Sequence, residues 1–491
     1  MTRTRQDQPR PPMIWSRRRR AAAVVGLALA HMVGVWSGPA RAENLEEALA
    51  LAYTTNPQLD AQRAALRSAD ERVSQAVAGY HPQVTARGSV GVNRSITETS
   101  NGVGSTSDPN GTTRATTQSK SAGVDLNQPL YQGGRISAGI EAAENRVRSQ
   151  RALLSAAEQE VLKQAVTVYM DVVRDQAVLR LTTSNEQVLR RQLEAAQDRF
   201  RVGEITRTDV SQAESRLARA TADRVSAEGR LQSSRSAYLR VVGKTPGELK
   251  APRVSYKLPA SSDETVTQAR TSNPSVIAAT YDEKAARSDI ETSNSARLPN
   301  LSLKAGVGRD WNDYTSYSLS PSSRTRPGDT ERDNAYVRAE VSVPLYTGGA
   351  NEARVREAKQ EASRRQVLIE QSRRQATDEA VRSWQQLVTS RASIQSRRSQ
   401  VRASEIALEG VRQEATVGSR TVLDTLDAEQ ELLDARVQLV SAERDEVVAA
   451  FTVLSAIGQL TARQLGLPVE HYDQEKYYQQ NRGRVFGTRI D

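Results

Sequence analysis

Two hydrophobic patterns share this chain, and the first has a period of two. Four segments alternate apolar with polar residues, which places the apolar set on one face of a strand and the polar set on the other. The stretches between paired segments, residues 94–118 and 310–334, are long and rich in Ser, Thr, Gly and Asn. We therefore predict two strand pairs, each joined by a long polar loop. The alternating segments cover residues 84–93, 121–127, 301–308 and 337–343.

The second pattern is a heptad repeat of apolar residues after each strand pair. No proline occurs within residues 130–245 or 345–467, so nothing there forces a helix to break. Heptads sustained over this length with charged flanks predict helices packed side by side as coiled coils. A Val-Gly pair ending at Gly203, and again at Gly418, predicts the turn of each helical hairpin. The repeated positions are Val147, Leu154, Val161 and Val168, then Leu387, Ile394, Val401 and Leu408.

Both patterns occur twice because the chain is internally duplicated. Residues 128–134 (QPLYQGG) match residues 343–349 (VPLYTGG) at an offset of 215, and Asp209 and Asp424 share that offset. Such a period is far longer than that of solenoid repeats, so the duplicated unit is large. We place the strand-to-helix junctions at the matched motifs. Their marker residues are Pro129, Gly133, Gly134, Pro344, Gly348 and Gly349.

The N-terminus has the pattern of an export signal. Four arginines (residues 17–20) precede a 16-residue apolar run (residues 21–36), and residues 40–42 supply a small-x-small cleavage site. We predict that this signal peptide is removed and that the mature chain begins near Glu43. It carries +7 of the formal net charge of +10, which leaves +3 and no basic surface for phosphate contacts. We therefore expect no nucleic-acid partner.

The duplicated plan divides the chain into eight predicted segments. In order they are a signal peptide (1–42), an N-terminal helical segment (43–81), a first strand hairpin with its loop (82–131), a first helical hairpin (132–246), a linker with the helical segment of the second repeat (247–298), a second strand hairpin with its loop (299–346), a second helical hairpin (347–467) and a polar tail (468–491). For the tail we expect a loose periplasmic segment, with contact to a partner protein as the alternative.

Composition indicates long solvated helices rather than globular cores. Aromatic residues make up 4% of the chain and charged residues 26%, which fits thin apolar stripes on exposed helices. The chain has no cysteine, so it has no disulfide and no thiol chemistry. One of the three histidines lies in the predicted signal peptide, and no nucleophile or phosphate-binding motif appears. We expect no enzyme, no metal site and no cofactor.

Four membrane-length strands cannot close a barrel alone. Membrane barrels need at least about eight strands, because an open edge leaves backbone groups unpaired in lipid. The chain must therefore associate if its strands lie in a membrane. Three copies are the simplest closure, although two would reach about eight strands. Strand pairs that continue into long helical hairpins would extend such a barrel into a tube, which is a conduit.

The duplicated layout, the Pro-Leu-Tyr-x-Gly-Gly junctions and the turns around residues 203–209 and 417–428 resemble the TolC family of outer-membrane efflux and secretion ducts. The resemblance runs from about Asn44 to Gly466. It implies a mainly α protein with membrane β, in which helical hairpins form an α-barrel and four strands per protomer build a trimeric twelve-stranded β-barrel. It also implies a homotrimer in outer-membrane lipid that works with a periplasmic membrane-fusion adaptor. An inner-membrane ABC or proton-driven pump would supply the energy to export drugs or unfolded proteins.

The resemblance also implies a gate at the periplasmic end. Asp424 and Asp427 match the constricting carboxylates of the family, and Arg420 matches an arginine that latches the two turns to each other. Thr208 and Asp209 match the partners of that arginine on the first turn. Three-fold symmetry would turn the two aspartates, three apart on one helix face, into stacked rings that attract cations. The family's aromatic latch residue is missing, because Ala415 stands in its place.

Two other interpretations remain open at this stage. Thr206 with Asp209, and Thr421 with Asp424, have the spacing of capping boxes at helix starts, so these acids could serve only to cap. At the level of the whole chain, the alternative is a non-pore periplasmic coiled-coil scaffold or an adaptor protein. A scaffold would explain the heptads but not the four alternating segments.

Overall fold

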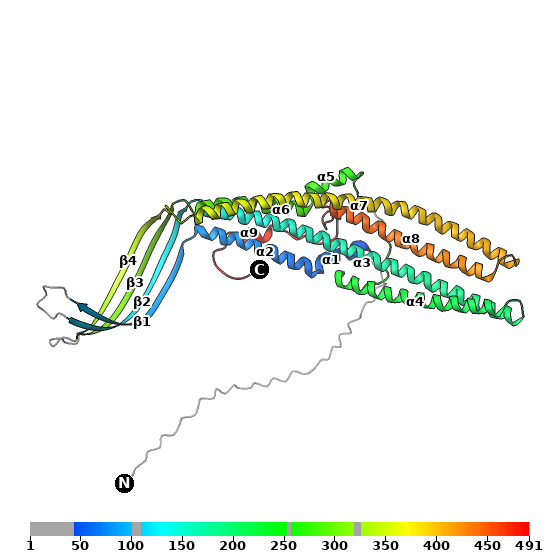
Figure 1. The fold of residues 1–491 in the computed structure, drawn as a ribbon, viewed down its shortest axis with the longest axis horizontal. Coiled ribbons are helices and arrows are strands. Elements are labelled where there is room, and N and C mark those ends of the chain that lie inside the picture. Colours follow the sequence, from blue (N-terminus) through cyan, green and yellow to red (C-terminus); the bar gives the residue numbers. More distant parts are fainter. Residues whose placement is uncertain (1–43, 101–109, 253–256, 319–325, 491) are drawn as a thin grey trace, which may run out of the picture. The chain divides into compact units, whose positions relative to one another are not determined.

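The computed structural model describes residues 44–100, 110–252, 257–318 and 326–490 (Figure 1). The predicted signal peptide, residues 1–42, lies outside the described residues. No helix in the described ranges is both long and apolar enough to cross a membrane. In chain order the elements are α1 (Leu45–Thr55), α2 (Pro57–Val77), a 3₁₀ helix η1 (Ala78–Tyr80), β1 (Gln83–Ser100), β2 (Asn110–Gln132), α3 (Arg135–Arg201), α4 (Arg207–Val242), α5 (Ser262–Ser272), α6 (Pro274–Ser295), β3 (Asn300–Ser318), β4 (Arg326–Ser342), α7 (Ala350–Thr416), α8 (Val422–Ala456) and α9 (Lys476–Asn481).

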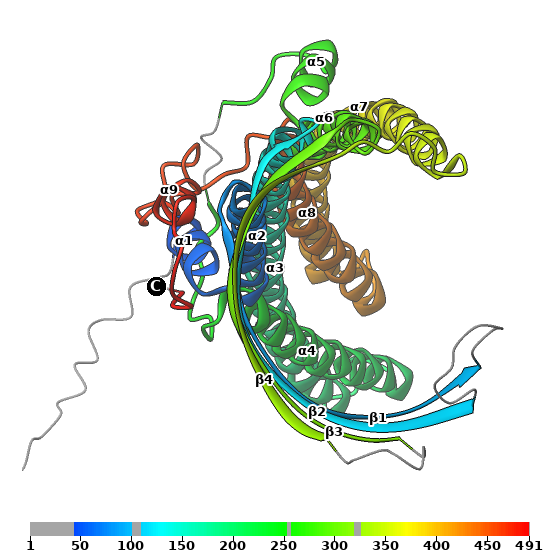
Figure 2. The same ribbon diagram turned by 90° about the vertical axis from the view of Figure 1, so that its left-hand side faces the viewer.

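The four strands form one antiparallel sheet in the order β1-β2-β3-β4, and they curve together along their length (Figure 2). They are longer than predicted, so most of residues 94–118 and 310–334 is strand rather than loop. The prediction was wrong there because residues such as 114–120 (RATTQSK) are polar at almost every position, which removes the apolar alternation. Cross-strand pairing and the β-branched threonines hold such a stretch extended. What connects the paired strands, residues 101–109 and 319–325, lies outside the described residues.

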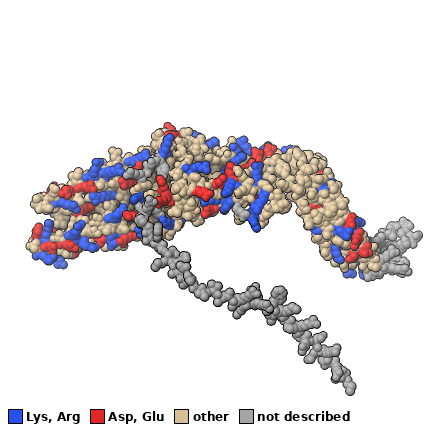
Figure 3. Space-filling view, turned by 180° about the vertical axis from the view of Figure 1, so that it is seen from behind, with Lys and Arg blue, Asp and Glu red and all other residues tan. Residues whose placement is uncertain are grey.

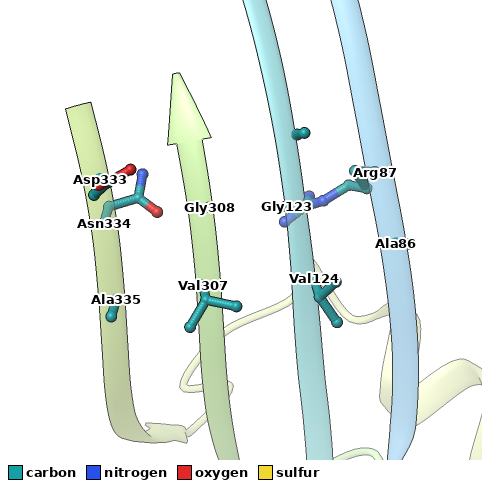
Figure 4. Close-up of a pocket in the computed structure, with 10 residues that line it drawn as sticks. Ala86, Arg87, Gly123, Val124, Val307, Gly308, Asp333, Asn334 and Ala335 are labelled. Carbon is teal, nitrogen blue, oxygen red and sulfur yellow. The ribbon is translucent and has the colours of Figure 1, made fainter. Parts of the chain in front are cut away.

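One face of the sheet is apolar. Ala86, Val124, Val307 and Ala335 lie in a single row across the four strands, one from each (Figure 4). Val307 has 61% of its surface exposed, so no segment within the described ranges covers this row. Over the strands the molecular surface is mostly uncharged until the far end of the sheet, whereas both signs of charge are interspersed over the helices (Figure 3).

The apolar face crosses the strands at a slant. Val92 on β1 and Val337 on β4 are 69% and 75% exposed. On β1 the apolar run continues to Val92, but on β4 it stops at Ala335, and the next residue on that face is Asp333. Because Ala335 is level with Ala86, the run ends six residues earlier on β4 than on β1. Tilted strands that pass through a membrane would present such a slanted band.

The opposite face of the sheet is polar and linked across its strands. Arg87 on β1 donates to the carboxylate of Asp125 on β2, and the hydroxyl of Tyr336 on β4 donates to the same carboxylate at 2.8 Å. The Tyr336 ring crosses over Gly306 on β3, where an added Cβ would lie 2.6 Å from a ring carbon. Glycine at that position is therefore what lets the ring reach the carboxylate.

The helices form two long hairpins, as predicted. α3 and α7 each have 67 residues and would extend for about 100 Å. Both begin after a glycine with positive φ, Gly134 at 84° and Gly349 at 81°. α3 packs along α4 and α7 packs along α8, and α3 also contacts α2, α6 and α8. In Figure 1 the sheet lies at one end of these helices and the hairpin turns lie at the other. The heptad residues Val147, Leu154, Val161, Val168, Leu387, Ile394 and Leu408 are buried.

The polar tail packs against α1, α2 and α3 as far as Arg482, so the expectation of a loose segment was wrong for residues 469–482, whereas residues 483–490 are exposed. The hydroxyl of Tyr477 donates to Glu71 at 2.8 Å, and Ser74 donates to the carbonyl of Asn481 at 3.0 Å. The amide of Tyr472 donates to the Tyr53 hydroxyl at 3.1 Å. Tyrosines make this possible, because each ring covers apolar surface while its hydroxyl reaches a polar partner.

Candidate functional site at the hairpin turns

The two hairpin turns have matching geometry. In the first, Gly203 takes a φ of +79° after α3 and Thr206 caps α4; in the second, Gly418 takes a φ of +79° after α7 and Thr421 caps α8. Positive φ reverses the chain within a few residues at little cost for glycine. Both turns lie where we predicted them.

Asp424 and Asp209 each complete a capping box. The Thr421 amide donates to Asp424 at 2.9 Å, and the Asp424 amide donates back to the Thr421 hydroxyl at 3.2 Å. Thr206 and Asp209 form the same pair at 2.9 and 3.3 Å. The bond from the Thr421 backbone, and then that from its hydroxyl, hold the pKa of Asp424 below its usual value. The Thr206 backbone and hydroxyl lower the pKa of Asp209 in the same way. Both carboxylates therefore stay charged at neutral pH.

Arg420 and its predicted partners do not meet through an ion pair within this chain. Arg420 pairs instead with Glu414 of its own turn, Nε to Oε2 at 2.9 Å, and half of its side chain is exposed. Arg420 and Asp209 line the same cavity between the turns, which has a volume of about 620 Å³. Ala415 also lines this cavity, so an alanine borders the space where the family has an aromatic ring. Thr208 is exposed on the first turn of α4.

Asp427 does join the two hairpins. Arg216 of α4 donates to its carboxylate, which links α4 to α8 near the turns. Sequence reasoning missed Arg216, although a signal was available. The internal offset makes Glu431 the equivalent of Arg216, and Glu431 lies four residues beyond Asp427 on α8. Opposite charges attract when two helices lie side by side with the charged residues at similar heights.

A buried carboxylate lies two residues further along α8. Glu429 is 6% exposed and accepts hydrogen bonds from Gln192 of α3 and from Arg412 of α7, the latter at 2.9 Å. Glu186 of α3 likewise accepts a bond from Arg224 of α4 at 2.6 Å. Sequence reasoning could not separate these glutamates from the many exposed ones, because the helices carry charges on several faces. They link α3 to its neighbours, Glu429 close to the turns and Glu186 about four helical turns further back.

The junctions differ in how tightly they pack. Pro129 lies inside β2, where the pairing with β3 shifts register before Tyr131, whereas Pro344 follows the end of β4. An added Cβ at Gly133 would lie 2.7 Å from Leu298 Cβ, but nothing lies within 4 Å of that position at Gly348. The first junction is therefore packed against the end of α6, and the second is open in this chain.

No group of three or more His, Asp or Glu side chains in the described ranges is placed to hold a metal ion. The charged groups at the turns pair, cap and repel, and none has the geometry of a nucleophile with an adjacent base. What this arrangement can do is hold helix ends together and present negative charge.

Comparison with known proteins assigns the family. The model of the outer membrane efflux protein family matches residues 48–244 and 265–459. The outer membrane efflux protein BepC of Brucella suis biovar 1 is 34% identical over 453 residues, 92% of this chain and 93% of that protein. Outer membrane protein TolC of Vibrio cholerae serotype O1 is 27% identical over 87% of this chain and 94% of that protein. The Campylobacter jejuni CmeC outer membrane channel has a TM-score of 0.69 at 14% identity, over 90% of this chain and 89% of that one, which confirms the predicted fold class. The chain belongs to the outer membrane efflux protein family, the family of TolC.

Proposed function

We propose that three copies of this chain close one barrel in the outer membrane and form a passive export duct. The observation that carries the proposal is the sheet, whose exposed apolar face ends at two edge strands, β1 and β4. Backbone groups at such edges cannot stay unpaired in lipid. The strand order lets β4 of one copy pair with β1 of the next, so that three copies give a closed wall of about twelve strands. A pore-free scaffold or an adaptor would leave the apolar face in water.

The helical hairpins would continue this barrel into the periplasm. Family membership supports a tripartite system, in which a periplasmic adaptor joins the duct to an inner-membrane ABC or proton-driven pump. The cargo would be a protein, as in type I secretion, or small toxic molecules, as in multidrug efflux. The duct itself would perform no chemistry, because the pump supplies the energy. Export of the chain through a cleaved signal peptide, residues 1–42, is part of this proposal.

We place the gate of the duct at the hairpin turns, with Asp424 and Asp427 as its constricting carboxylates. Asp427 is exposed, and Asp424 holds its charge to low pH because the Thr421 backbone and hydroxyl donate to it. Three copies around one axis would bring these carboxylates together in rings that favour cations. Capping and gating are compatible, because the cap orients the Asp424 carboxylate and leaves part of it exposed. We expect Arg420, Thr208 and Asp209 to latch the closed gate between protomers, since Arg420 pairs with Glu414 inside this chain.

The gate is tested by removing charge while keeping the cap. Asp424→Asn with Asp427→Asn retains a side-chain oxygen that can accept from the Thr421 amide. In planar lipid bilayers, this double variant should conduct more than the unmodified trimer. Its block by Mg²⁺ should weaken by on the order of tenfold, which corresponds to about 1.4 kcal/mol of ion binding.

The control is Glu431→Ala, because Glu431 is an exposed acid on the same helix. Glu431→Ala should change neither the conductance nor the block by Mg²⁺. Unaltered conductance and Mg²⁺ block in a correctly assembled double variant would remove the gate from Asp424 and Asp427.

A further inference from the structure

Arg216 occupies a distinctive place among the charged residues near the turns. Asp424 and Asp209 are engaged by their own caps, and Arg420 pairs within its own turn. Of the five residues predicted for the gate, Asp427 is the one whose ion pair crosses to the other hairpin. In the part of the chain that the structure describes, Arg216–Asp427 is the ion pair that joins α4 to α8.

The pair borders a small apolar contact between the hairpins. Leu189 of α3, Ala220 of α4 and Leu426 of α8 are buried together, with Leu217 packed against them. Arg216 and Asp427 are the sequence neighbours of Leu217 and Leu426. So few apolar side chains meet here that the hairpins gain little from burial at this level. A polar link at the border therefore weighs more than it would beside a large core.

We propose that Arg216 is a positioning residue of the gate: it holds α8 against α4 through Asp427, and it masks the Asp427 charge from the duct. This inference rests on the proposed function and assigns a role to a residue outside the predicted gate set. Asp427 is charged in both states of the gate. While α4 and α8 lie together, its charge is paired with Arg216 and masked from the duct. When the helices separate, the carboxylate is unpaired and its charge is no longer masked.

The effect of the Arg216–Asp427 pair, called the latch below, on the equilibrium between the closed and open gate is modest for one protomer and larger for three. The side chains of Arg216 and Asp427 are 26% and 57% exposed, so water and salt weaken their attraction. An exposed pair shifts a two-state equilibrium by up to about fivefold. Three such pairs that break together would shift it by up to on the order of 100-fold. The latch can therefore bias the closed state without making opening impossible.

Masking of the Asp427 charge makes a prediction that a purely mechanical link between α4 and α8 does not. Loss of Arg216 would free α8 and also unmask three Asp427 carboxylates. Loss of the Asp427 charge would free α8 as well, but it would leave three unpaired arginines. Both changes should open the gate, yet they should move cation block in opposite directions. A purely structural role for the pair would move block in the same direction in both variants.

The experiment compares Arg216→Gln, Asp427→Asn and the double variant as trimers in planar bilayers, with Mg²⁺ as the blocking ion. Both single variants should raise conductance, and the double variant should add little to either. Mg²⁺ should block Arg216→Gln at a concentration about threefold to fivefold lower than in the unmodified duct, and Asp427→Asn at a higher one. The reversed pair, Arg216→Asp with Asp427→Arg, should return conductance toward the closed level, because it restores attraction between α4 and α8.

The matched control is Arg219→Gln, because Arg219 lies on the same helix and its ion pair with Asp223 stays within α4. It should change neither reading. Suppose that Arg216→Gln has the conductance and the Mg²⁺ block of the control, while Asp424→Asn with Asp427→Asn still raises conductance. The proposed role of Arg216 is then wrong, and the assignment of the gate to Asp424 and Asp427 stands. If Asp424→Asn with Asp427→Asn also leaves conductance and Mg²⁺ block unchanged, the gate assignment itself is wrong. Additive effects of the two single changes on conductance would also overturn the latch, because they would then act on separate contacts.

Discussion

The two helical hairpins have nearly the same dimensions but bury different surfaces. α3 and α7 both have 67 residues, yet α3 buries bulky side chains such as Leu162 and Tyr169 on several sides. α7 buries a narrow stripe in which small residues such as Ala362 and Ala376 recur at heptad spacing. The reason is the surroundings: α3 lies among α1, α2, α4, α6 and α8, and α7 lies beside α5, α6 and α8. Duplication preserved the length and the turns, while neighbours from elsewhere in the chain set the burial.

The comparison also shows what α7 leaves uncovered. Val367, Val381 and Val388 are spaced by multiples of seven, with Arg374 at the intervening position, and they are 66%, 38% and 46% exposed. A second apolar row at heptad spacing is what a helix presents to another helix in a coiled coil. In the proposed trimer this row of α7 would face a neighbouring copy. α3 would then bury its apolar surface within the chain, and α7 would bury the corresponding surface between chains.

The largest effect is expected from charges placed in that row. Val381→Glu with Val388→Glu should abolish the trimer, because six carboxylates would have to be buried at the contacts between copies. Analysis of unheated samples by gel electrophoresis, or native mass spectrometry, would show the loss of the trimer band. Thr389→Glu adds a charge at an exposed position of the same helix that is turned by about 100° from Val388, and it should leave the trimer intact. An intact trimer in the double variant would mean that α7 meets its neighbour through another face.

The second effect compares two equivalent aromatic residues. Tyr169 on α3 is fully buried and donates to the Lys250 carbonyl at 2.8 Å, whereas its counterpart Trp384 on α7 is only partly buried. Tyr169→Ala should lower the free energy of unfolding by about 3–5 kcal/mol, because it leaves a cavity and an unmade hydrogen bond. Trp384→Ala should cost about 1–2 kcal/mol. Urea unfolding followed by circular dichroism measures both, and equal losses would contradict the contrast between the hairpins.

The smallest effect concerns a carboxyl that occurs in the first half alone. Asp70 is 3% exposed, and neither of its oxygens has a hydrogen-bond partner among the described residues. Burial raises its pKa to about 6, although Arg151 nearby opposes the shift. Its counterpart at the offset of 217, Arg287, has a side chain that is 67% exposed. The difference arises because the C-terminal tail packs over α2 near Asp70, whose burial is the main cause of the raised pKa, with the negative charge of Glu71 adding to it.

This carboxyl should make the tail sensitive to pH. A raised pKa means that the packed state favours neutral Asp70, so its contribution is complete below the ordinary value near 4 and is lost as pH rises through about 6. Hydrogen exchange in residues 470–484, corrected for intrinsic rates, should show the tail opening more often at pH 7.5 than at pH 5, by up to about tenfold. Asp70→Asn should remove this dependence, and Arg287→Gln should not. A pH dependence unchanged by Asp70→Asn would assign it to another group.

Much of this structure could be predicted because it depends on residues close together in the sequence or on simple periodicity. The heptads placed the buried stripes of α3 and α7, the Val-Gly pairs placed the turns, and Thr206 and Thr421 marked the helix starts. The strand faces followed from alternation, but the strand ends did not, because polar residues occupy both faces beyond the apolar band. Glycines 133 and 348 share a motif, yet their packing differs through Leu298, which no local pattern reveals.

The sequence by itself determined the duplicated plan, the helix lengths, the turns and the apolar face of the sheet, since each depends on local conformational preference or on a short period. Only the tertiary structure decided that Arg216 reaches Asp427, that Glu429 is buried and that the tail packs over α2. Arg216 and Asp427 are 211 residues apart, and Tyr477 and Glu71 are 406 apart. Such pairs form because the fold lays one helix beside another, and the height at which two helices meet depends on the packing of the whole bundle.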